Sequence, residues 1–578
     1  MRIVSGLLAL LLGLAALLGG IGLQTIWTPP LTLTAEVGDD PTEAPLTVIT
    51  GEFAEIDEDP VEYTLTGDGD YTVMLGRERD IQAWIGDAAH NTVKGIQTDV
   101  PEGEQPHVIV EHAEGEMTVP NPVDSDLWIE THEASGTLAQ RWTLPEEDQT
   151  ALLIAVDGTA PAPTDVTVTW TNRVGDSPWI VPLLVIGPLL ILIGLGLLLW
   201  AWLRKRRDGG QSPHSAEQSS RRSGRRAAEA ASGQGSSTAR RVGTGAAVGL
   251  LALTVSLPGP ATASPSAEGG ADQSATQEGE FIPLLVDQQL ERILGRIEGR
   301  VQQGDTEQDA EQFGNRVSGM ARTMRELNYR NRAIDEDQAE PAPLAAAPVL
   351  SAVGTEDGSF PRTVLVVTEG EQNETPHLSV LRQRAPRQQY QLVYAVPMAP
   401  GATLPGMSMT DQGLSRIDLK DADGLMMSPS EAVAGVTAYL TDEDDDFKDK
   451  MAPSAYATAI QDYQKDVAES AKDTDVSLKR HPRPRETMAF RLPDGSALVF
   501  ASVYANVYVS PKEEGGTVIA SDLVAEVAGE SETETTKDLS MRYRELMVLR
   551  VPAEGGDDAD AQVSLDGFED ELYVVDYQ

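Results

Sequence analysis

Acidic side chains gather in two neighbouring stretches of the first half of the chain, where their oxygens could hold calcium. The stretches contain Glu55, Asp57, Glu58, Asp59, Asp68 and Asp70. Calcium-binding loops of the EF-hand type repeat their oxygen ligands over about twelve residues. The sequence has no such pattern here, so we interpret both stretches as a solvated acidic surface.

Three histidines in the same half of the chain are candidate zinc ligands. Each lies near a glutamate, the six residues being His107, Glu111, His112, Glu130, His132 and Glu133. Neutral imidazole and carboxylate are ordinary zinc ligands. However, residues five apart on a strand point to opposite faces, which separates His107 from His112. We therefore predict no metal site and no other cofactor.

Recognisable catalytic motifs are missing from the sequence. It has no cysteine, which excludes disulfides, thiolate nucleophiles and sulfur-ligated metal sites. The patterns GxSxG, GxxxxGK[ST] and HExxH are also absent. The segment 243–249 has the glycine spacing of a dinucleotide loop, but it lies inside an apolar run with no preceding strand. We predict no catalytic and no cofactor-binding residue.

The later half of the chain contains two histidines that could serve in acid/base chemistry, His377 and His481. His481 lies in the basic, proline-rich segment 479–485, which contrasts with the acidic residues around it. We interpret this segment as an exposed connector. The alternative is that it docks an acidic partner.

Three apolar runs separate the regions that carry these residues. Val4–Leu23 is uncharged and, at about 1.5 Å per residue, spans a hydrocarbon core of about 30 Å. It continues towards Trp27 without a cleavage signal, so we expect an uncleaved helix. Pro178–Leu203 has tryptophans at both ends and the basic cluster Arg204–Arg207 directly after it, as in a membrane helix with a cytoplasmic end.

The third apolar run, Val242–Leu257, has only 16 residues and allows two interpretations. Arginines precede it and the small residues Ala261–Ser264 follow it, as in a signal sequence cleaved after Ala263. Alternatively it is an intact third helix, with Gly245 and Gly249 as a packing face. We favour the intact helix.

Charge is strongly segregated along the chain. The whole sequence has 44 Lys and Arg against 91 Asp and Glu, a net charge of −47. Between Arg204 and Arg241, by contrast, ten basic residues accompany three acidic ones. Basic loops beside membrane helices stay in the cytoplasm, which predicts a multi-pass protein of the cell membrane with both large acidic regions extracytoplasmic. The acidic surface also argues against nucleic acid as a partner.

The two acidic regions differ in their patterns. Between Leu31 and Trp170, short runs of β-forming residues alternate with Gly, Pro and Asp pairs, which predicts a β-sandwich-like domain. The later region begins with apolar residues at helical spacing over 290–301 and 313–327, followed by strands. The order repeats after an expected helix start at Ser428-Pro-Ser-Glu, which predicts two α+β units.

The later region also resembles a known family. Asn315-Arg-Val-Ser-Gly319, Phe360-Pro-Arg-Thr-Val364 and Met398-Ala-Pro-Gly-Ala-Thr-Leu-Pro405 are similar to segments of uncharacterised actinobacterial membrane-anchored envelope proteins with an NTF2-like extracytoplasmic region. The resemblance covers residues 281–578. It implies cone-shaped α+β units and a role in the cell envelope, and it supplies no catalytic residue.

The predicted fold class is therefore a membrane-anchored multidomain chain, with three transmembrane helices, an all-β sandwich-like outer domain and an α+β tandem NTF2-like outer region. Its expected parts are transmembrane helix 1 (1–30), the β-sandwich-like domain (31–176), transmembrane helix 2 (177–203), a cytoplasmic, basic, unfolded linker (204–241), transmembrane helix 3 or an internal signal-like segment (242–263), a linker (264–280) and NTF2-like units 1 (281–425) and 2 (426–578).

The sequence predicts large folded regions attached to membrane helices, and it has no catalytic motif. This combination favours a non-enzymatic binding, scaffold or accessory component of the cell envelope. Its expected partners are membrane lipids and another envelope protein or a wall-associated ligand. The alternative is an enzyme whose cavity acts on a lipid, glycan or small metabolite. A cavity lined by an Asp or His with a strongly shifted pKa would favour that alternative.

Overall fold

Two units make up the chain, and a computed structural model provides their coordinates. One unit comprises Met1–Pro29 and Val174–Gly279, and the other comprises Pro30–Arg173 and Glu280–Gln578. The residues that the structure describes are 2–27, 32–38, 41–50, 61–97, 106–142, 150–171, 178–208, 283–371, 373, 375–404, 407–409, 413–555 and 561–578.

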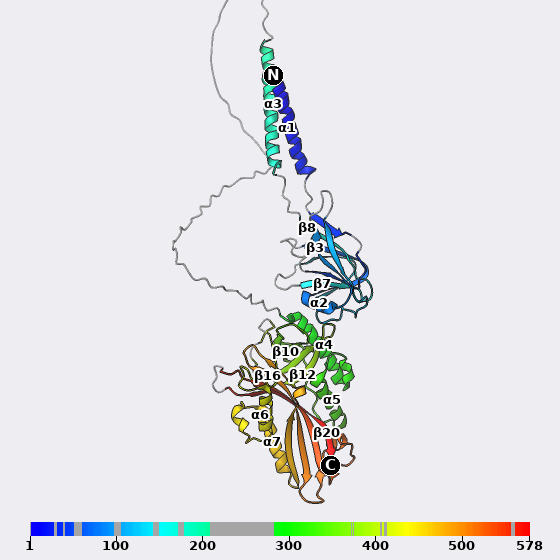
Figure 1. Ribbon diagram of the computed structural model, residues 1–578, viewed down its shortest axis with the longest axis vertical. Helices are drawn as coiled ribbons and strands as arrows, with labels where there is room; N and C mark the ends of the chain where they lie inside the picture. Colours follow the sequence, from blue (N-terminus) through cyan, green and yellow to red (C-terminus); the bar gives the residue numbers. More distant parts are fainter. Residues whose placement is uncertain are drawn as a thin grey trace, which may run out of the picture. The chain divides into compact units, whose positions relative to one another are not determined.

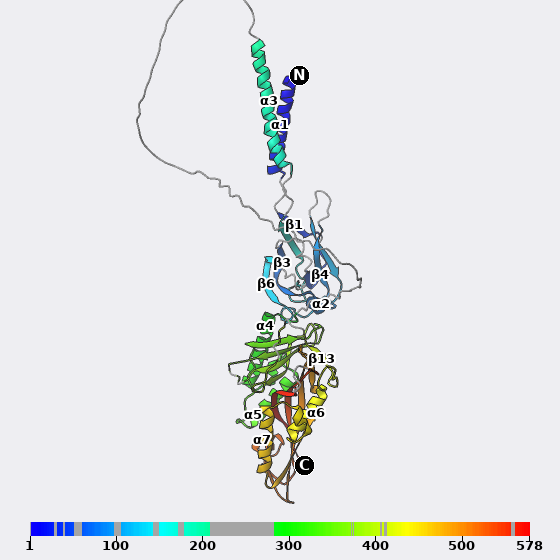
Figure 2. The same ribbon diagram turned by 90° about the vertical axis from the view of Figure 1, so that its left-hand side faces the viewer.

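The described part of the first unit is a pair of apolar helices, α1 (Arg2–Thr25) and α3 (Ile180–Asp208). They lie side by side in both views (Figures 1 and 2). Glycines bring the two backbones together, because a Cβ on Gly13 would lie 2.7 Å from the carbonyl oxygen of Gly187. Near the start of α1, Gly6 meets Gly194 in the same way, so the helices run antiparallel.

The prediction of three transmembrane helices is wrong for this structure. Among the described residues, two helices are long and apolar enough to cross a membrane, Val4–Thr25 and Ile180–Arg204. The third predicted segment, 242–263, lies outside the described residues. Its apolar core of 16 residues is shorter than the roughly 20 that a span requires.

The multi-pass localisation with extracytoplasmic domains depended on those three helices, and it is not supported. Two candidate spans are weak evidence, because a signal sequence near the N-terminus also passes a test of length and composition. The predicted linker 204–241 also starts too early, since α3 continues through the basic cluster to Asp208.

A β-barrel opens the second unit. Its elements are β1 (Thr32–Val37), β2 (Leu46–Ile49), β3 (Val61–Arg77), α2 (Glu78–Ile85), β4 (His90–Gln97), β5 (His107–Ala113), β6 (Glu130–Trp142), β7 (Thr150–Ala155) and β8 (Asp165–Thr171). The strand order is β6-β3-β7-β2-β4-β5-β1-β8, and β8 pairs back onto β3. Seven strands thus close a ring, and β6 pairs with β3 outside it.

The predicted β-sandwich is therefore corrected to a closed barrel. Closure depends on β3, whose register shifts between Thr66 and Asp70. Its first half pairs with β8 and its second half, from Thr72 onward, pairs with β7. An irregularity of this kind lets one long strand bend and pair in two directions. The alternation of apolar and polar residues along the strand does not predict it.

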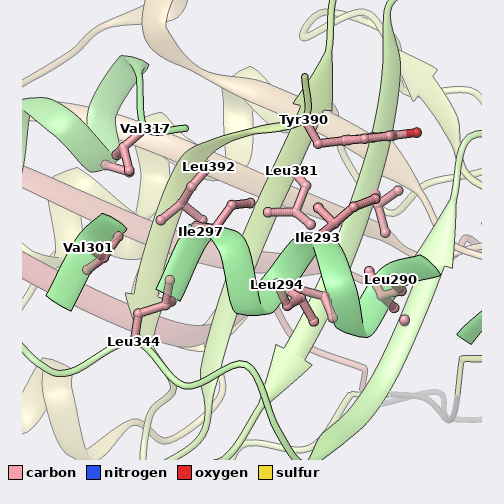
Figure 3. Packing of buried hydrophobic residues seen from close by; sticks show 14 of the residues in the cluster. Leu290, Ile293, Leu294, Ile297, Val301, Val317, Leu344, Leu381, Tyr390 and Leu392 are labelled. Carbon is pink, nitrogen blue, oxygen red and sulfur yellow. The ribbon is translucent and has the colours of Figure 1, made fainter. Parts of the chain in front are cut away.

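The remainder of the second unit contains a four-stranded antiparallel sheet in the order β12-β11-β10-β9. Its strands and helices are α4 (Asp287–Glu307), the short 3-10 helix η2 (Ala310–Phe313), α5 (Gly319–Ile334), β9 (Val349–Gly354), β10 (Arg362–Thr368), β11 (His377–Gln383) and β12 (Gln391–Pro397). Figure 3 shows Ile293 and Ile297 of α4 packed towards Leu381 and Leu392 of the sheet. The spacing that predicted this helix also builds the core.

A second sheet follows, in the order β13-β15-β16-β19-β20, with β14 paired to β16. Its strands are β13 (Ser415–Ile417), β14 (Thr474–Pro482), β15 (Met488–Arg491), β16 (Ala497–Pro511), β19 (Leu539–Val551) and β20 (Ser564–Tyr577). The accompanying helices are α6 (Pro429–Thr441), η3 (Asp446–Lys450), α7 (Ala455–Ser470), η4 (Pro484–Glu486) and α8 (Asp522–Val527). A separate two-stranded antiparallel sheet pairs β17 (Val518–Ile519) with β18 (Glu534–Thr535).

The tandem NTF2-like arrangement is also corrected. Val380 of the first sheet and Phe500 of the second belong to one hydrophobic core. In addition β13, which falls within the first predicted unit, pairs with β15 of the second sheet. The two sheets therefore share a core instead of enclosing two separate cones. The other predicted domain limits stay predictions.

Candidate ligand-binding groove

A groove lies between α7 and one face of the second sheet. The face is formed by β14, β16, β19 and β20, and Figures 1 and 2 show α7 beside these long strands. Side chains alternate between the faces of a strand, and cross-strand partners share a face. Leu478 pairs with Val507, and Val507 pairs with Met541, so these three side chains lie together in the groove.

The helix that covers the groove starts with a capped first turn. Ser454 accepts a hydrogen bond from the backbone N–H of Ala457 at 3.3 Å. Apolar residues then recur on one face of α7, including Tyr456, Ile460 and Tyr463, and they line the groove. Only Ala457 of this helix is buried, and Tyr463 is 69% exposed. The helix therefore covers the sheet without filling the space beneath it.

The space under α7, which we call the α7 groove, has a volume of about 630 Å³. This lies within the range of about 300 to 1,000 Å³ that is usual for small-molecule sites. Most of its lining is apolar or aromatic, as such sites require. The sheet contributes Val476, Leu478, Val507, Met541, Tyr543 and Phe568.

A buried ion pair forms part of the groove floor. Arg480 Nε and Nη2 donate to the Glu545 carboxylate, at 2.9 Å to Oε2 and 2.9 Å to Oε1. Arg480 Nη1 also donates to the Leu440 carbonyl at 2.7 Å, which ties the pair to the end of α6. Burial raises the pKa of Glu545, and the neighbouring guanidinium opposes that shift. The geometry fixes both side chains in one arrangement.

Asp570 lies directly opposite Glu545 in the pairing of β19 with β20 and also lines the groove. Desolvation by the surrounding protein raises the pKa of Asp570 to about 7, Glu545 and Glu571 raise it further, and Arg480 lowers it. Within the described part of the chain, the Asp570 carboxylate has no hydrogen bond and no ion pair. Near neutral pH it therefore exists in both protonation states, at a solvent-exposed position on the wall of the groove.

A second hollow, of about 710 Å³, lies between α4 and the proline-rich segment 340–347. Its lining is mainly polar, and one of its carboxylates, that of Asp305, is already hydrogen-bonded. Asp305 accepts hydrogen bonds from Arg325 at 2.6 Å and from the Tyr329 hydroxyl at 2.5 Å. Because those bonds already satisfy the carboxylate, the α7 groove is the better candidate for a ligand site.

The two histidines considered for acid/base chemistry lie outside the groove lining. His377 is buried in the first sheet, where Asn373 Nδ2 lies 3.1 Å from its Nδ1. Burial, and then Arg325, lower the pKa of His377 to about 4, so it is neutral at physiological pH. His481 is an exposed residue of β14, which corrects the prediction that 479–485 is a connector, because residues up to Pro482 form a strand.

The candidate metal ligands do not come together. His112 Nδ1 lies 3.0 Å from Asn91 Oδ1, whereas His132 Nε2 lies 3.3 Å from Glu130 Oε2. Among the described residues, no group of three or more His, Asp and Glu side chains could hold a metal ion. Asp68 and Asp70 line a shallow pocket at the barrel, and the acidic stretch from Glu55 to Asp59 lies outside the described residues.

Sequence reasoning missed the charged residues of the groove, although a signal for one of them exists. Alternate residues of β19 read Met541, Tyr543, Glu545, Met547 and Leu549, so a single charge interrupts an apolar row. A charge in such a row needs a partner when the strand is buried. The row predicts a buried partner for Glu545 but does not identify Arg480.

Comparison with known proteins yields one partial match. Residues 358–567 match the family model described as a domain of unknown function, DUF8094. The matched part is less than half of the chain, and it contains Arg480 and Glu545 but ends before Asp570. No curated protein matches this chain. No solved structure matches it either.

Proposed function

We propose that this chain is a membrane-anchored, non-enzymatic binding component of a bacterial cell envelope, and that its α7 groove holds a small, largely apolar ligand. The observation that carries the proposal is the cavity of about 630 Å³ beneath α7, which has an apolar lining and a few fixed polar groups. That combination is typical of ligand sites.

The helix pair α1 and α3 supports membrane anchoring. Arg204 and Arg206 lie over the rings of Trp200 and Trp202, at 4.9 and 4.0 Å from Cζ to the ring centroid. Tryptophan and arginine together at one helix end are typical of the boundary between hydrocarbon and headgroups. We therefore expect membrane lipids among the partners. Extraction of cell membranes with alkaline carbonate tests this, since an anchored chain stays in the pellet and a peripheral one is released.

A pair of adjacent substitutions tests the groove. Val507 lines it, whereas its neighbour Tyr508 points to the other face of β16, where Lys479 lies 5.8 Å from its ring. Val507→Trp should fill the space and abolish binding of 4-phenyl-1-butanol to the full chain in lipid nanodiscs, measured by calorimetry against empty nanodiscs. Tyr508→Trp is the matched control and should bind as the unchanged chain does. Equal binding by both variants would contradict the proposal.

One observation favours the enzymatic alternative. Asp570 is a solvent-exposed carboxyl group on the wall of the groove with a pKa of about 7, as a general base requires. Water activated by Asp570 could then hydrolyse an ester bound in the groove. With 4-nitrophenyl butyrate as the probe, this function requires the unchanged chain to release nitrophenolate faster than Asp570→Asn does. Equal rates for the two proteins would exclude hydrolysis by Asp570 and support the binding function.

A further inference from the structure

The charges that face the α7 groove do not balance. Its floor has two carboxylates, Glu545 and Asp570, and one guanidinium, Arg480. Arg480 holds Glu545 through two of its nitrogens and uses a third on the Leu440 carbonyl. Arg480 is therefore already bonded to two partners, and among the described residues the solvent-exposed Asp570 has no hydrogen-bonded or ion-paired partner of its own.

The covering helix adds no charge of its own. The residues of α7 that line the groove are apolar or neutral, with Gln464 as the most polar. On the neighbouring positions of β20, Glu571 accepts hydrogen bonds from Asn328 and Asn331 of α5, and Glu569 shares its face of the strand. Both are negative when ionised, so neither offers Asp570 a cation.

Aromatic rings also line the groove. Tyr456 and Phe568 have ring centroids 6.1 Å apart, and Tyr463 and Tyr543 also line the groove. Aromatic faces attract cations, most strongly where water is excluded. A carboxylate and several aromatic rings that line one groove are complementary to an ammonium group. An anion would instead meet Asp570 and Glu545, both of which would repel it.

We infer that the ligand of the α7 groove is an amphiphile with a protonated amine, whose ammonium pairs with Asp570 while its apolar body lies against α7 and the sheet. This inference rests on the proposed function and names the class of ligand. The amine forms a charge-assisted hydrogen bond to the carboxylate. Its carbon chain gains from burial, with affinity rising about fourfold for each added methylene.

Three probes with one apolar body and different ends test the inference. These are 4-phenylbutylamine, 4-phenyl-1-butanol and 4-phenylbutyrate, titrated into the full chain in lipid nanodiscs at pH 8, with empty nanodiscs as the reference. An ion pair with an exposed carboxylate predicts that the amine binds about twofold to fivefold more tightly than the alcohol. The butyrate should bind most weakly.

Matched substitutions on β20 locate the effect. Asp570→Asn should reduce the affinity for the amine to that for the alcohol and leave the alcohol unchanged. Asp576→Asn removes the same charge from another exposed position of the same strand, which lies outside the groove, and should change neither affinity. Circular dichroism of both variants shows whether they fold as the unchanged chain does.

The possible failures are distinguishable. If the alcohol or the butyrate binds as tightly as the amine, or if Asp570→Asn keeps the preference for the amine, the inference is overturned and the binding function stands. If none of the three probes binds, the proposed function itself fails. A preference for the amine that Asp570→Asn removes and Val507→Trp abolishes supports both.

Discussion

Asp126 and Arg316 form a buried, two-point ion pair across 190 residues of sequence. The Arg316 Nη1 and Nη2 atoms donate to the Asp126 carboxylate at 2.5 and 3.0 Å, and the Asp126 side chain is 0% exposed. The same carboxylate accepts the backbone N–H of Tyr390 at 2.8 Å. The pair therefore joins the segment between β5 and β6 of the barrel to the helices and first sheet that follow.

We predict that Asp126→Ala lowers the free energy of unfolding of the second unit by about 3 to 5 kcal/mol, because it leaves the Arg316 guanidinium buried without its partner. Asp124→Ala, two residues away at an exposed position, should change it by less than about 0.5 kcal/mol. Denaturant titration of the two variants, followed by circular dichroism, measures the difference. Equal midpoints would show that the pair does not hold the barrel in place.

The ion pair between Asp126 and Arg316 also gives a structural role to one of the segments that resemble the envelope family. Arg316 belongs to the segment Asn315–Gly319, and Arg362 belongs to Phe360–Val364. Arg362 donates to Asp80 of α2, and both side chains are almost fully buried. Both arginines thus bind carboxylates of the barrel part. The envelope family suggested by these segments stays a prediction.

Local elements could be predicted where the pattern and the caps agree. The start of α6 is confirmed, because Ser428 caps the helix, Glu431 completes a capping box and Pro429 occupies the first turn. The second predicted helix began too early, since Phe313 ends a short 3-10 helix and α5 starts at Gly319. Apolar spacing cannot detect this break, because both pieces bury their residues in one core.

Long-range features were beyond the sequence for a physical reason. Closure of the barrel depends on which strands β3 pairs with, and a strand's own residues do not encode its partners. The groove could not be predicted for a similar reason. The spacing of Tyr456, Ile460 and Tyr463 predicts a helix, but it does not show whether that helix packs tightly against the sheet. Asp570 acquires its role only through that unfilled space.

The ion pair on the groove floor predicts non-additive effects of mutation. Arg480→Met leaves Glu545 buried without its partner and should cost about 3 to 5 kcal/mol of unfolding free energy. Arg480→Met combined with Glu545→Leu should recover most of that loss, because neither charge stays in the core. Chemical denaturation of the two single variants and the double variant gives the coupling. Additive losses would mean that the two side chains act independently.

The raised pKa values of Asp570 and Glu569, both about 7, predict a stability that falls as pH rises. Each carboxyl group ionises near pH 4 when the chain is unfolded and near pH 7 when it is folded, so the folded state binds more protons between those values. The stabilising effect is complete below pH 4, decreases between pH 4 and 7 and is absent above pH 7. Glu545 and Glu571, whose pKa values are also raised, contribute in the same direction.

Asp570→Asn should therefore reduce the decrease in melting temperature between pH 4 and 7, without abolishing it, because four other carboxyl groups with raised pKa values remain: Glu545, Asp566, Glu569 and Glu571. The same variant should melt at a higher temperature than the unchanged chain at pH 8. Asp576→Asn is the control at an exposed position of β20. Thermal unfolding curves at several pH values measure these shifts. Parallel curves for both variants and the unchanged chain would exclude a titrating Asp570 in this range.

Contact between α1 and α3 can be tested with cysteines, since the chain has none of its own. A Cβ at Gly194 would lie 3.1 Å from Leu10 Cβ, close enough for a disulfide, whereas a Cβ at Gly196 has no atom within 4 Å. We predict that Leu10→Cys with Gly194→Cys crosslinks under mild oxidation in membranes, and that Leu10→Cys with Gly196→Cys does not. Mass spectrometry of unreduced peptides detects the link. Similar yields from both pairs would mean that the two helices do not pack through their glycines.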